Sequence, residues 1–325
     1  MEIEIRKPLI GEEDALGYIW KTVFDDGDES AFFNYYYNPE LSIIAAHSGI
    51  PVSTGYLLPA GNLICGDLTV PCAMIYGVAT LPEYRKLGFG TAVVRKLILT
   101  AHSAGFPAIV LCPSTNSLFE YYSSRTDFRD WFYIMERKFK KIPQTSTADR
   151  LVEVLPNDYN NARKKLLANI PHIEPDMRAL SYQSALCQEL GGGLFQTDTP
   201  GGISCAIVER QRDGALWIKE VLAPVGYEGN MLAAIASVFP AEEYIVRTPA
   251  GRFNSQFTTH YPKFTIQNSE FRIPNSEFPN SVIGQFCSWD CESVVRRFGM
   301  LTASDAMLQA LLAYNVFPWF GLAFD

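Results

Sequence analysis

Hydrophobic and polar positions in residues 1–140 repeat with two periods, one typical of helices and the other of strands. Helical spacing is clearest in residues 12–24, where Leu16, Ile19 and Trp20 share one apolar face. Short apolar runs bounded by Gly, Pro, Asn or Ser predict strands. The predicted order is strand 2–6, helix 12–24, helix 30–37, strands 41–47, 52–58, 63–70 and 73–80, helix 85–103, strand 108–112, helix 117–124 and strand 131–139.

The turns predicted between the strands of residues 41–80 are short. They fall at residues 48–49 and 59–62. Turns of this length join antiparallel neighbours, so these strands are expected to form an antiparallel meander. The run at 108–112 is wholly apolar and follows a helix, a pattern typical of a strand buried on both faces and parallel to its neighbour.

The second half begins after a polar stretch. Residues 140–150 contain Pro143 and a Gln-Thr-Ser-Thr run, and a chain of 325 residues favours two domains. We therefore predict a first domain at 1–140, a linker at 141–150 and a second domain at 151–325. A hairpin over residues 204–222, a helix at 228–239 and a strand at 244–248 repeat the order of elements in residues 52–112, which indicates an internal duplication.

Composition narrows the class of protein. Hydrophobic residues make up 48% and charged residues 19%, as in an ordinary folded protein. The net charge of −8 opposes a nucleic-acid surface, which needs clustered positive charge. The charged start and the absence of an apolar run of about 20 residues predict a cytoplasmic protein with no membrane partner. Seven scattered cysteines and four histidines show no zinc-ligand spacing, so we predict no metal.

Residues 75–91 carry the candidate chemistry. An apolar strand enters a loop with Gly88 and Gly90, and this loop opens directly into a helix. The first N–H groups of a helix lack internal partners and lie at the positive end of its dipole, so they can hold a pyrophosphate. Glycine tolerates positive φ and lets phosphate oxygens approach the backbone. The glycine spacing is neither that of a dinucleotide-binding turn nor that of a P-loop.

The motif Arg85-x-x-Gly88-x-Gly90, after a V-A-T-x-P strand end, resembles the acyl-CoA signature R/Q-x-x-G-x-G/A of GNAT acyltransferases. The resemblance covers residues 1–140 and implies an α/β fold with a mixed sheet and acetyl-CoA as co-substrate. In such enzymes two central strands splay apart, and the pantetheine arm lies in the gap. By this resemblance the acetyl-CoA-binding residues are Val78, Ala79, Thr80, Arg85, Lys86, Leu87, Gly88, Phe89, Gly90, Thr91 and Asn116.

The same resemblance implies a tyrosine as general acid. Residues 113–122 look like the family's final helix, where a tyrosine near the CoA sulfur precedes a phenylalanine by five residues. Here the phenylalanine is Phe128, and Tyr122 precedes it by six residues. One inserted residue leaves Tyr121 and Tyr122 both as candidates, and we prefer Tyr122.

A base is also needed, because an amine with a pKa near 10.4 is only about one part in a thousand neutral at pH 7. Residues 72–80 contain no carboxylate. The candidates are a water relay, Asp67, His47 and the C-terminal carboxylate of Asp325. Acetyltransferases of the enhanced-intracellular-survival type, which the chain resembles in having additions after an active first domain, use their terminal carboxylate as the base.

The second half lacks the signature, because residues 225–230 have a different glycine spacing and a carboxylate, Glu228, that would repel pyrophosphate. We interpret it as a degenerate GNAT-like domain, with a sterol-carrier-like fold as the alternative. The predicted function is direct transfer of acetyl from acetyl-CoA to a primary amine of a small molecule or peptide. A catalytically silent acyl-CoA-binding sensor is the alternative. Cys112 is disfavoured as a nucleophile because no histidine lies near it in sequence.

Overall fold

The computed structural model describes residues 3–24, 29–142, 150–250, 270–272, 291–304, 307, 311 and 318–321. In chain order its elements are β1 (Ile3–Arg6), α1 (Glu13–Val23), α2 (Glu29–Tyr35), a 3₁₀ turn (Pro39–Leu41), β2 (Ser42–His47), β3 (Ile50–Cys65), β4 (Leu68–Thr80), a 3₁₀ turn (Pro82–Tyr84), α3 (Phe89–Ser103), β5 (Ala108–Leu111), α4 (Asn116–Arg125), β6 (Arg129–Phe139), β7 (Val152–Glu153), α5 (Pro156–Leu167), β8 (His172–Glu174), α6 (Met177–Glu189), β9 (Gly193–Thr199), β10 (Gly202–Arg210), β11 (Leu216–Leu222), α7 (Glu228–Val238), β12 (Tyr244–Pro249), β13 (Glu270–Arg272) and β14 (Cys291–Ala303).

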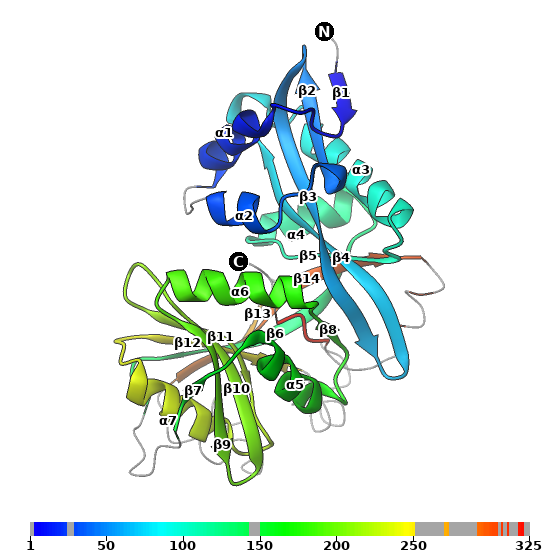
Figure 1. The fold of residues 1–325 in the computed structure, drawn as a ribbon. Helices are drawn as coiled ribbons and strands as arrows, with labels where there is room; N and C mark the ends of the chain where they lie inside the picture. Colours follow the sequence, from blue (N-terminus) through cyan, green and yellow to red (C-terminus); the bar gives the residue numbers. More distant parts are fainter. Residues whose placement is uncertain are drawn as a thin grey trace.

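These strands form one continuous mixed sheet that runs through both halves of the chain (Figure 1). The strand order is β1-β2-β3-β4-β5-β14-β6-β12-β11-β10-β9-β7. Strands β1 to β4 are antiparallel neighbours, and β4 and β5 are parallel, as the turn lengths and the apolar run at 108–112 predict. Helix α1 packs on one face of this part of the sheet and α3 on the other, so both faces are covered (Figure 1).

The turn predicted at residues 59–62 is wrong. β3 continues through it, and the chain reverses later, between Cys65 and Leu68. The turn-like residues instead form a bulge, where the β3–β4 register shifts between Pro59 and Gly61. Gly61 has a φ of +100°, and a Cβ there would lie 2.1 Å from the carbonyl oxygen of Glu174 in β8. Glycine at this position therefore allows β8 to pair with β3.

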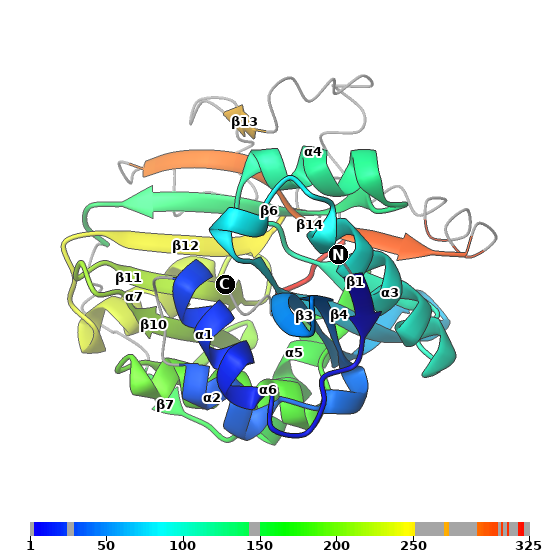
Figure 2. The ribbon, with the colours of Figure 1, turned by 90° about the horizontal axis from the view of Figure 1, so that it is seen from above.

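Strand β14 lies between β5 and β6, although it comes from the far end of the chain. Figure 2 shows it beside β6. Its residues 300–303 pair with β5, and residues 291–301 pair with β6. On its other side β6 pairs with β12. The sequence pattern did not predict this strand. It belongs to the second half of the chain, yet it fills a position in the sheet of the first half.

The second half repeats the topology of the first. β10 and β11 form an antiparallel hairpin, α7 follows, and β12 returns parallel to β11. The same relations hold for β3, β4, α3 and β5, so the predicted order of repeated elements is confirmed. Residues 143–149 of the proposed linker lie outside the described residues, and the domain boundary stays a prediction.

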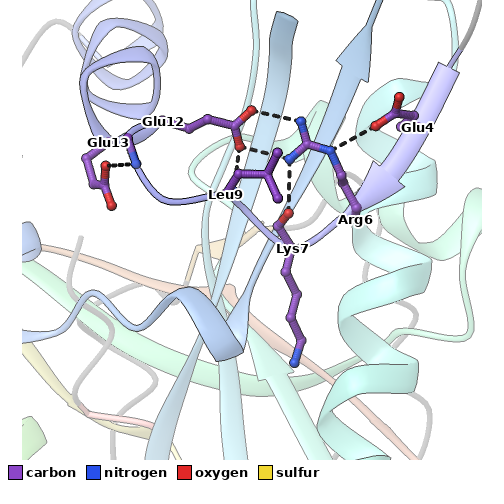
Figure 3. A network of polar contacts seen from close by, with 7 residues as sticks. Glu4, Arg6, Lys7, Leu9, Glu12 and Glu13 are labelled. Carbon is purple, nitrogen blue, oxygen red and sulfur yellow. Dashed lines mark hydrogen bonds and ion pairs between the residues drawn. The ribbon is translucent and has the colours of Figure 1, made fainter. Parts of the chain in front are cut away.

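A polar network fixes β1 to the start of α1 (Figure 3). The Arg6 guanidinium donates to both carboxylate oxygens of Glu12, each at 2.8 Å, and to Glu4 at 2.9 Å. The bond to Arg6 lowers the pKa of Glu12 below its usual value of 4.5. The pair therefore stabilises the fold fully above that pH, and its contribution is lost as the pH falls through the lowered pKa.

No helix among the described residues is both long enough and apolar enough to cross a bilayer.

Candidate functional site

The parallel pairing of β4 and β5 is short. It joins residues 72–74 to residues 108–110 and then stops. Residues 75–80 of β4 continue beside β3 with no β5 partner. The two central strands of the sheet therefore part, as the resemblance implied.

A bulge in β4 accompanies this parting. Thr54 of β3 faces Ala79 and Tyr56 faces Tyr76, so β4 has one extra residue in this interval. Gly77 lies in it with a φ of +57°, and a Cβ there would be 2.8 Å from the Trp20 ring. Bulges bend a strand and redirect its backbone groups, so the gap depends on a glycine at this position.

A cavity of about 280 Å³ occupies the gap. Its walls come from residues 74–78 of β4, from residues 111–114 at the end of β5 and just after it, from α1 and its C-cap Phe24, and from α4. None of the lining residues that the structure describes carries a charged side chain. The cavity therefore suits uncharged, largely apolar groups.

The start of α3 lies beyond the end of β4. Gly88 is its N-cap with a φ of +88°, and no side chain caps the helix. The first N–H groups of α3 are thus available to an anion. Arg85, Lys86 and Leu87 in the preceding loop are exposed, and the Arg85 Nε donates to the Thr80 carbonyl at 3.1 Å. This bond holds the loop against the end of β4.

Tyr121 of α4 is outside the cavity lining, and its side chain reaches the start of α3. Its hydroxyl forms a 2.8 Å hydrogen bond with Oγ1 of Thr91. A Cβ at Gly90 would lie 3.3 Å from the Tyr121 hydroxyl and 3.4 Å from Oγ1 of Thr80. Tyr121 therefore braces α4 against the first turn of α3.

Tyr122 lines the cavity instead. Consecutive residues of a helix point about 100° apart, which separates the two neighbouring tyrosines of α4. Burial raises the pKa of the Tyr122 hydroxyl above its usual value, so this group stays protonated at neutral pH.

A sequence model described as an acetyltransferase (GNAT) domain matches residues 4–146. Residues 4–146 are a GNAT acetyltransferase domain. GNAT enzymes take their acyl group from acyl-CoA, so this domain is that of an acyltransferase.

Solved structures share the fold over nearly the whole chain. A probable N-acyltransferase from Enterococcus faecalis, a conserved protein of unknown function, has a TM-score of 0.63 and 14% identity, covering 96% of this chain and 74% of that one. A GCN5-related N-acetyltransferase from Anabaena variabilis has a TM-score of 0.62 and 16% identity, covering 94% and 74%. Eis1 from Mycobacterium abscessus has a TM-score of 0.60 and 10% identity, covering 93% and 74%. No curated protein matches the chain in sequence.

The remaining binding candidates of the GNAT domain contribute differently. Val78 lines the cavity, whereas Ala79 is buried and Phe89 packs its ring against His47 and Tyr84. Ala79 and Phe89 are therefore limited to backbone contacts. Asn116 is the exposed first residue of α4, and its side chain accepts a weak 3.5 Å hydrogen bond from Arg297 of β14.

The base candidates are spread over the structure. Asp67 lies in the β3–β4 turn, at the end of β4 opposite Thr80, and His47 contacts Tyr84 outside the cavity lining. Asp325 lies outside the described residues. The acidic run at residues 25–28 is also outside them, although Phe24 just before it lines the cavity.

The described end of the chain is linked to the cavity wall through aromatic contacts. Trp319 and Phe320 are both buried. The Phe320 ring lies 4.9 Å from that of Phe132 and 6.2 Å from that of Phe298. The Phe298 carbonyl in turn accepts a 2.8 Å hydrogen bond from the Cys112 thiol, which lines the cavity.

A buried polar cluster anchors this end to the second half. The Trp319 indole N–H donates to the Glu220 carboxylate, which also pairs with Arg163 at 2.9 Å and with the Tyr159 hydroxyl at 2.5 Å. The side chains of Arg163 and Glu220 are fully buried. Gly321 has a φ of +73°, and a Cβ there would lie 2.3 Å from the Glu220 carboxylate, so only glycine fits beside this cluster.

The predicted pyrophosphate site at the start of α3, here called the cradle, has a counterpart at the start of α7 in the second half, where an acidic side chain blocks it. Gly226, before α7, has a φ of +87°, and its N–H donates to the Glu228 carboxylate at 3.2 Å. An acidic side chain thus occupies the start of α7, where the first half leaves free N–H groups. This arrangement agrees with the expectation of a degenerate GNAT-like second domain.

Proposed function

We propose that the protein transfers an acetyl group from acetyl-CoA to a primary amine by direct attack, without a covalent enzyme intermediate. The observation that carries the proposal is the gap between β4 and β5, which opens beside the uncapped start of α3 and contains Tyr122. The pantetheine arm enters this gap and bonds to the backbone of Val78 and Thr80. The pyrophosphate binds N–H groups of residues 87–91, with Arg85 and Lys86 adding positive charge.

The reaction follows from these contacts. The neutral amine attacks the thioester carbonyl, and backbone N–H groups of β4 stabilise the developing oxyanion. Collapse of the tetrahedral intermediate breaks the carbon–sulfur bond, and the leaving thiolate takes the proton of Tyr122. The apolar surroundings that raise the pKa of Tyr122 raise that of the thiolate too, because both anions are desolvated there. The phenolate regains its proton from solvent.

The proton of the attacking amine needs a base, and we propose a carboxylate of Asp325. Residues 72–80 of β4 contain no carboxylate. Gly321 is anchored by the cluster around Glu220, and Phe320 packs near Phe298, whose carbonyl contacts Cys112 in the cavity wall.

The function is tested by measuring CoA release from acetyl-CoA with a panel of polyamines, aminoglycosides, amino acids and simple amines. The proposal predicts saturable release with at least one amine. Tight acetyl-CoA binding without turnover on any of them would favour the sensor instead, and failure to bind acetyl-CoA would reject both functions.

Gly88→Val should weaken acetyl-CoA binding at least about tenfold, or about 1.4 kcal/mol, because it forces a β-branched side chain into a left-handed backbone at the phosphate cradle. Gly105→Val is the matched control. Gly105 has the same φ of +88° at the other end of α3, and a Cβ there meets nothing within 4 Å. It should cost similar folding stability and leave binding unchanged. Equal affinity of the two folded variants in calorimetry would reject the cradle.

Tyr122→Phe should lower turnover by about 100-fold or more and leave the Kd for acetyl-CoA within about twofold, because a general acid acts mainly in the transition state. Tyr121→Phe is the neighbouring control, and it removes the bond to Thr91 at the start of α3. It should affect acetyl-CoA binding more than turnover at saturation. The reverse pattern would mean that Tyr121 is the acid.

Removing Phe324 and Asp325, or adding a C-terminal tag, should reduce turnover at neutral pH far more than acetyl-CoA affinity, because both changes displace the proposed base. An N-terminal tag of the same sequence is the control. Steady-state rates with the best amine of the panel provide the measurement. Full activity of the C-terminally tagged enzyme would rule out Asp325 as the base.

A further inference from the structure

The α1 side of the cavity is a wall of aromatic rings. Trp20 of α1 and Phe24, the C-cap of this helix, have ring centroids 5.0 Å apart, and the Tyr76 ring of β4 lies 5.8 Å from that of Trp20. Behind them Phe32 of α2 stacks on Trp20 at 5.0 Å with an interplanar angle of 14°. This packing holds the indole in one orientation, so the wall is formed before a ligand binds.

The described lining contains no carboxylate or other negatively charged side chain that could pair with a cation. Its polar side chains are Tyr76, Cys112, Ser114 and Tyr122. Tyr76 is already hydrogen-bonded to Tyr182, and the Cys112 thiol donates to the Phe298 carbonyl. The carboxylate proposed above for Asp325 takes the proton of the attacking amine, so a second ammonium group on an acceptor would lose its hydration here without gaining a carboxylate from the described lining.

The same lining favours one form of the attacking amine. Apolar surroundings destabilise an ammonium ion, so they lower the pKa of a bound amine and raise the fraction that is neutral and reactive. An aromatic ring on the acceptor adds buried apolar area and edge or face contacts with Trp20 and Phe24. The residual ammonium form is attracted to the face of the indole.

We propose that the acceptor is an arylalkylamine, a primary amine carried on an aromatic ring, and that Trp20, Phe24 and Tyr76 determine this specificity. The proposal rests on the acetyl transfer proposed above. It places the ring on the α1 side of the cavity, leaves the β4 and β5 side to the pantetheine arm, and points the amino group toward Val78 and Tyr122.

The first test compares 2-phenylethylamine, n-octylamine and 1,7-diaminoheptane, which have equal numbers of non-hydrogen atoms. The expected kcat/KM is about tenfold higher for phenylethylamine than for octylamine, because ring contacts add to the apolar area, and lowest for the diamine. Octylamine reacting as well as phenylethylamine would overturn the role of the rings. A preference for the diamine or for an aminoglycoside would overturn the apolar acceptor class.

The second test replaces aromatic residues of the wall by leucine. Phe24→Leu should lower kcat/KM for phenylethylamine about tenfold, with a much smaller effect on octylamine and with the acetyl-CoA Kd within about twofold. Trp20→Leu should lower kcat/KM for phenylethylamine by a similar factor, and its acetyl-CoA Kd is measured alongside because Trp20 also packs against the Gly77 bulge. Tyr18→Leu is the control, because Tyr18 lies on the same helix and is 61% exposed. Trp20 packs in the core, so Phe24→Leu decides the question if Trp20→Leu does not fold. An equal loss with both amines would overturn the proposal.

Acetyl-CoA binding distinguishes a failure of the acceptor proposal from a failure of the acetyl-transfer function. Calorimetry with acetyl-CoA alone reports on the proposed acyl-transfer site and is independent of the acceptor. Normal acetyl-CoA binding with a polycation as the best acceptor would overturn the arylalkylamine proposal and leave acetyl transfer intact. Absence of acetyl-CoA binding would overturn the acetyl-transfer function and, with it, the acceptor class.

Discussion

The site depends on the parting of two parallel strands. β4 and β5 pair over three residues each, and beyond Met74 one edge of β4 lacks a strand partner. Backbone N–H and C=O groups inside a protein must bond to something, so an unpaired strand edge beside a cavity is a natural binding surface for a ligand that carries amide groups. Gly77 permits the bulge that accompanies the parting, because a side chain there would collide with Trp20 and Tyr56. The aromatic wall and the gap are thus parts of one packing arrangement.

The second half of the chain supports the site through the sheet. β6 joins the two halves by pairing with β12 on one side and with β14 on the other. β14 completes the first half beside β5, and its Phe298 carbonyl bonds to Cys112 at the cavity. The cluster of Arg163, Glu220 and Trp319 holds the described end of the chain against the same region. This buried ion pair is fully desolvated, so removing one partner would leave an uncompensated charge in the interior.

Local signals predicted most elements of the first half and the cradle at Gly88, because helical periodicity, turn residues and glycine spacing are encoded within a few positions. They failed at residues 59–62, where Pro59 and Gly61 shape a bulge beside β8 that only tertiary packing reveals. They also missed β14, whose pairing with β5 spans about 190 residues and leaves no local trace. Tyr121 and Tyr122 stayed open in the sequence, since the helix phase relative to the gap is a three-dimensional property. Gly77, a glycine inside a strand, was the available signal for the bulge.

The central claim, that acyl-CoA occupies the gap between β4 and β5, is tested most directly by alkylation of Cys112. Cys112 is partly exposed in the cavity wall, whereas Cys65, Cys72, Cys187 and Cys205 are buried. Mass spectrometry of the modified peptides follows each thiol separately. With a saturating non-hydrolysable analogue of acetyl-CoA, the account predicts that modification of Cys112 slows at least about tenfold, since the bound pantetheine arm covers it. An unchanged rate at Cys112, with the analogue bound, would contradict the account.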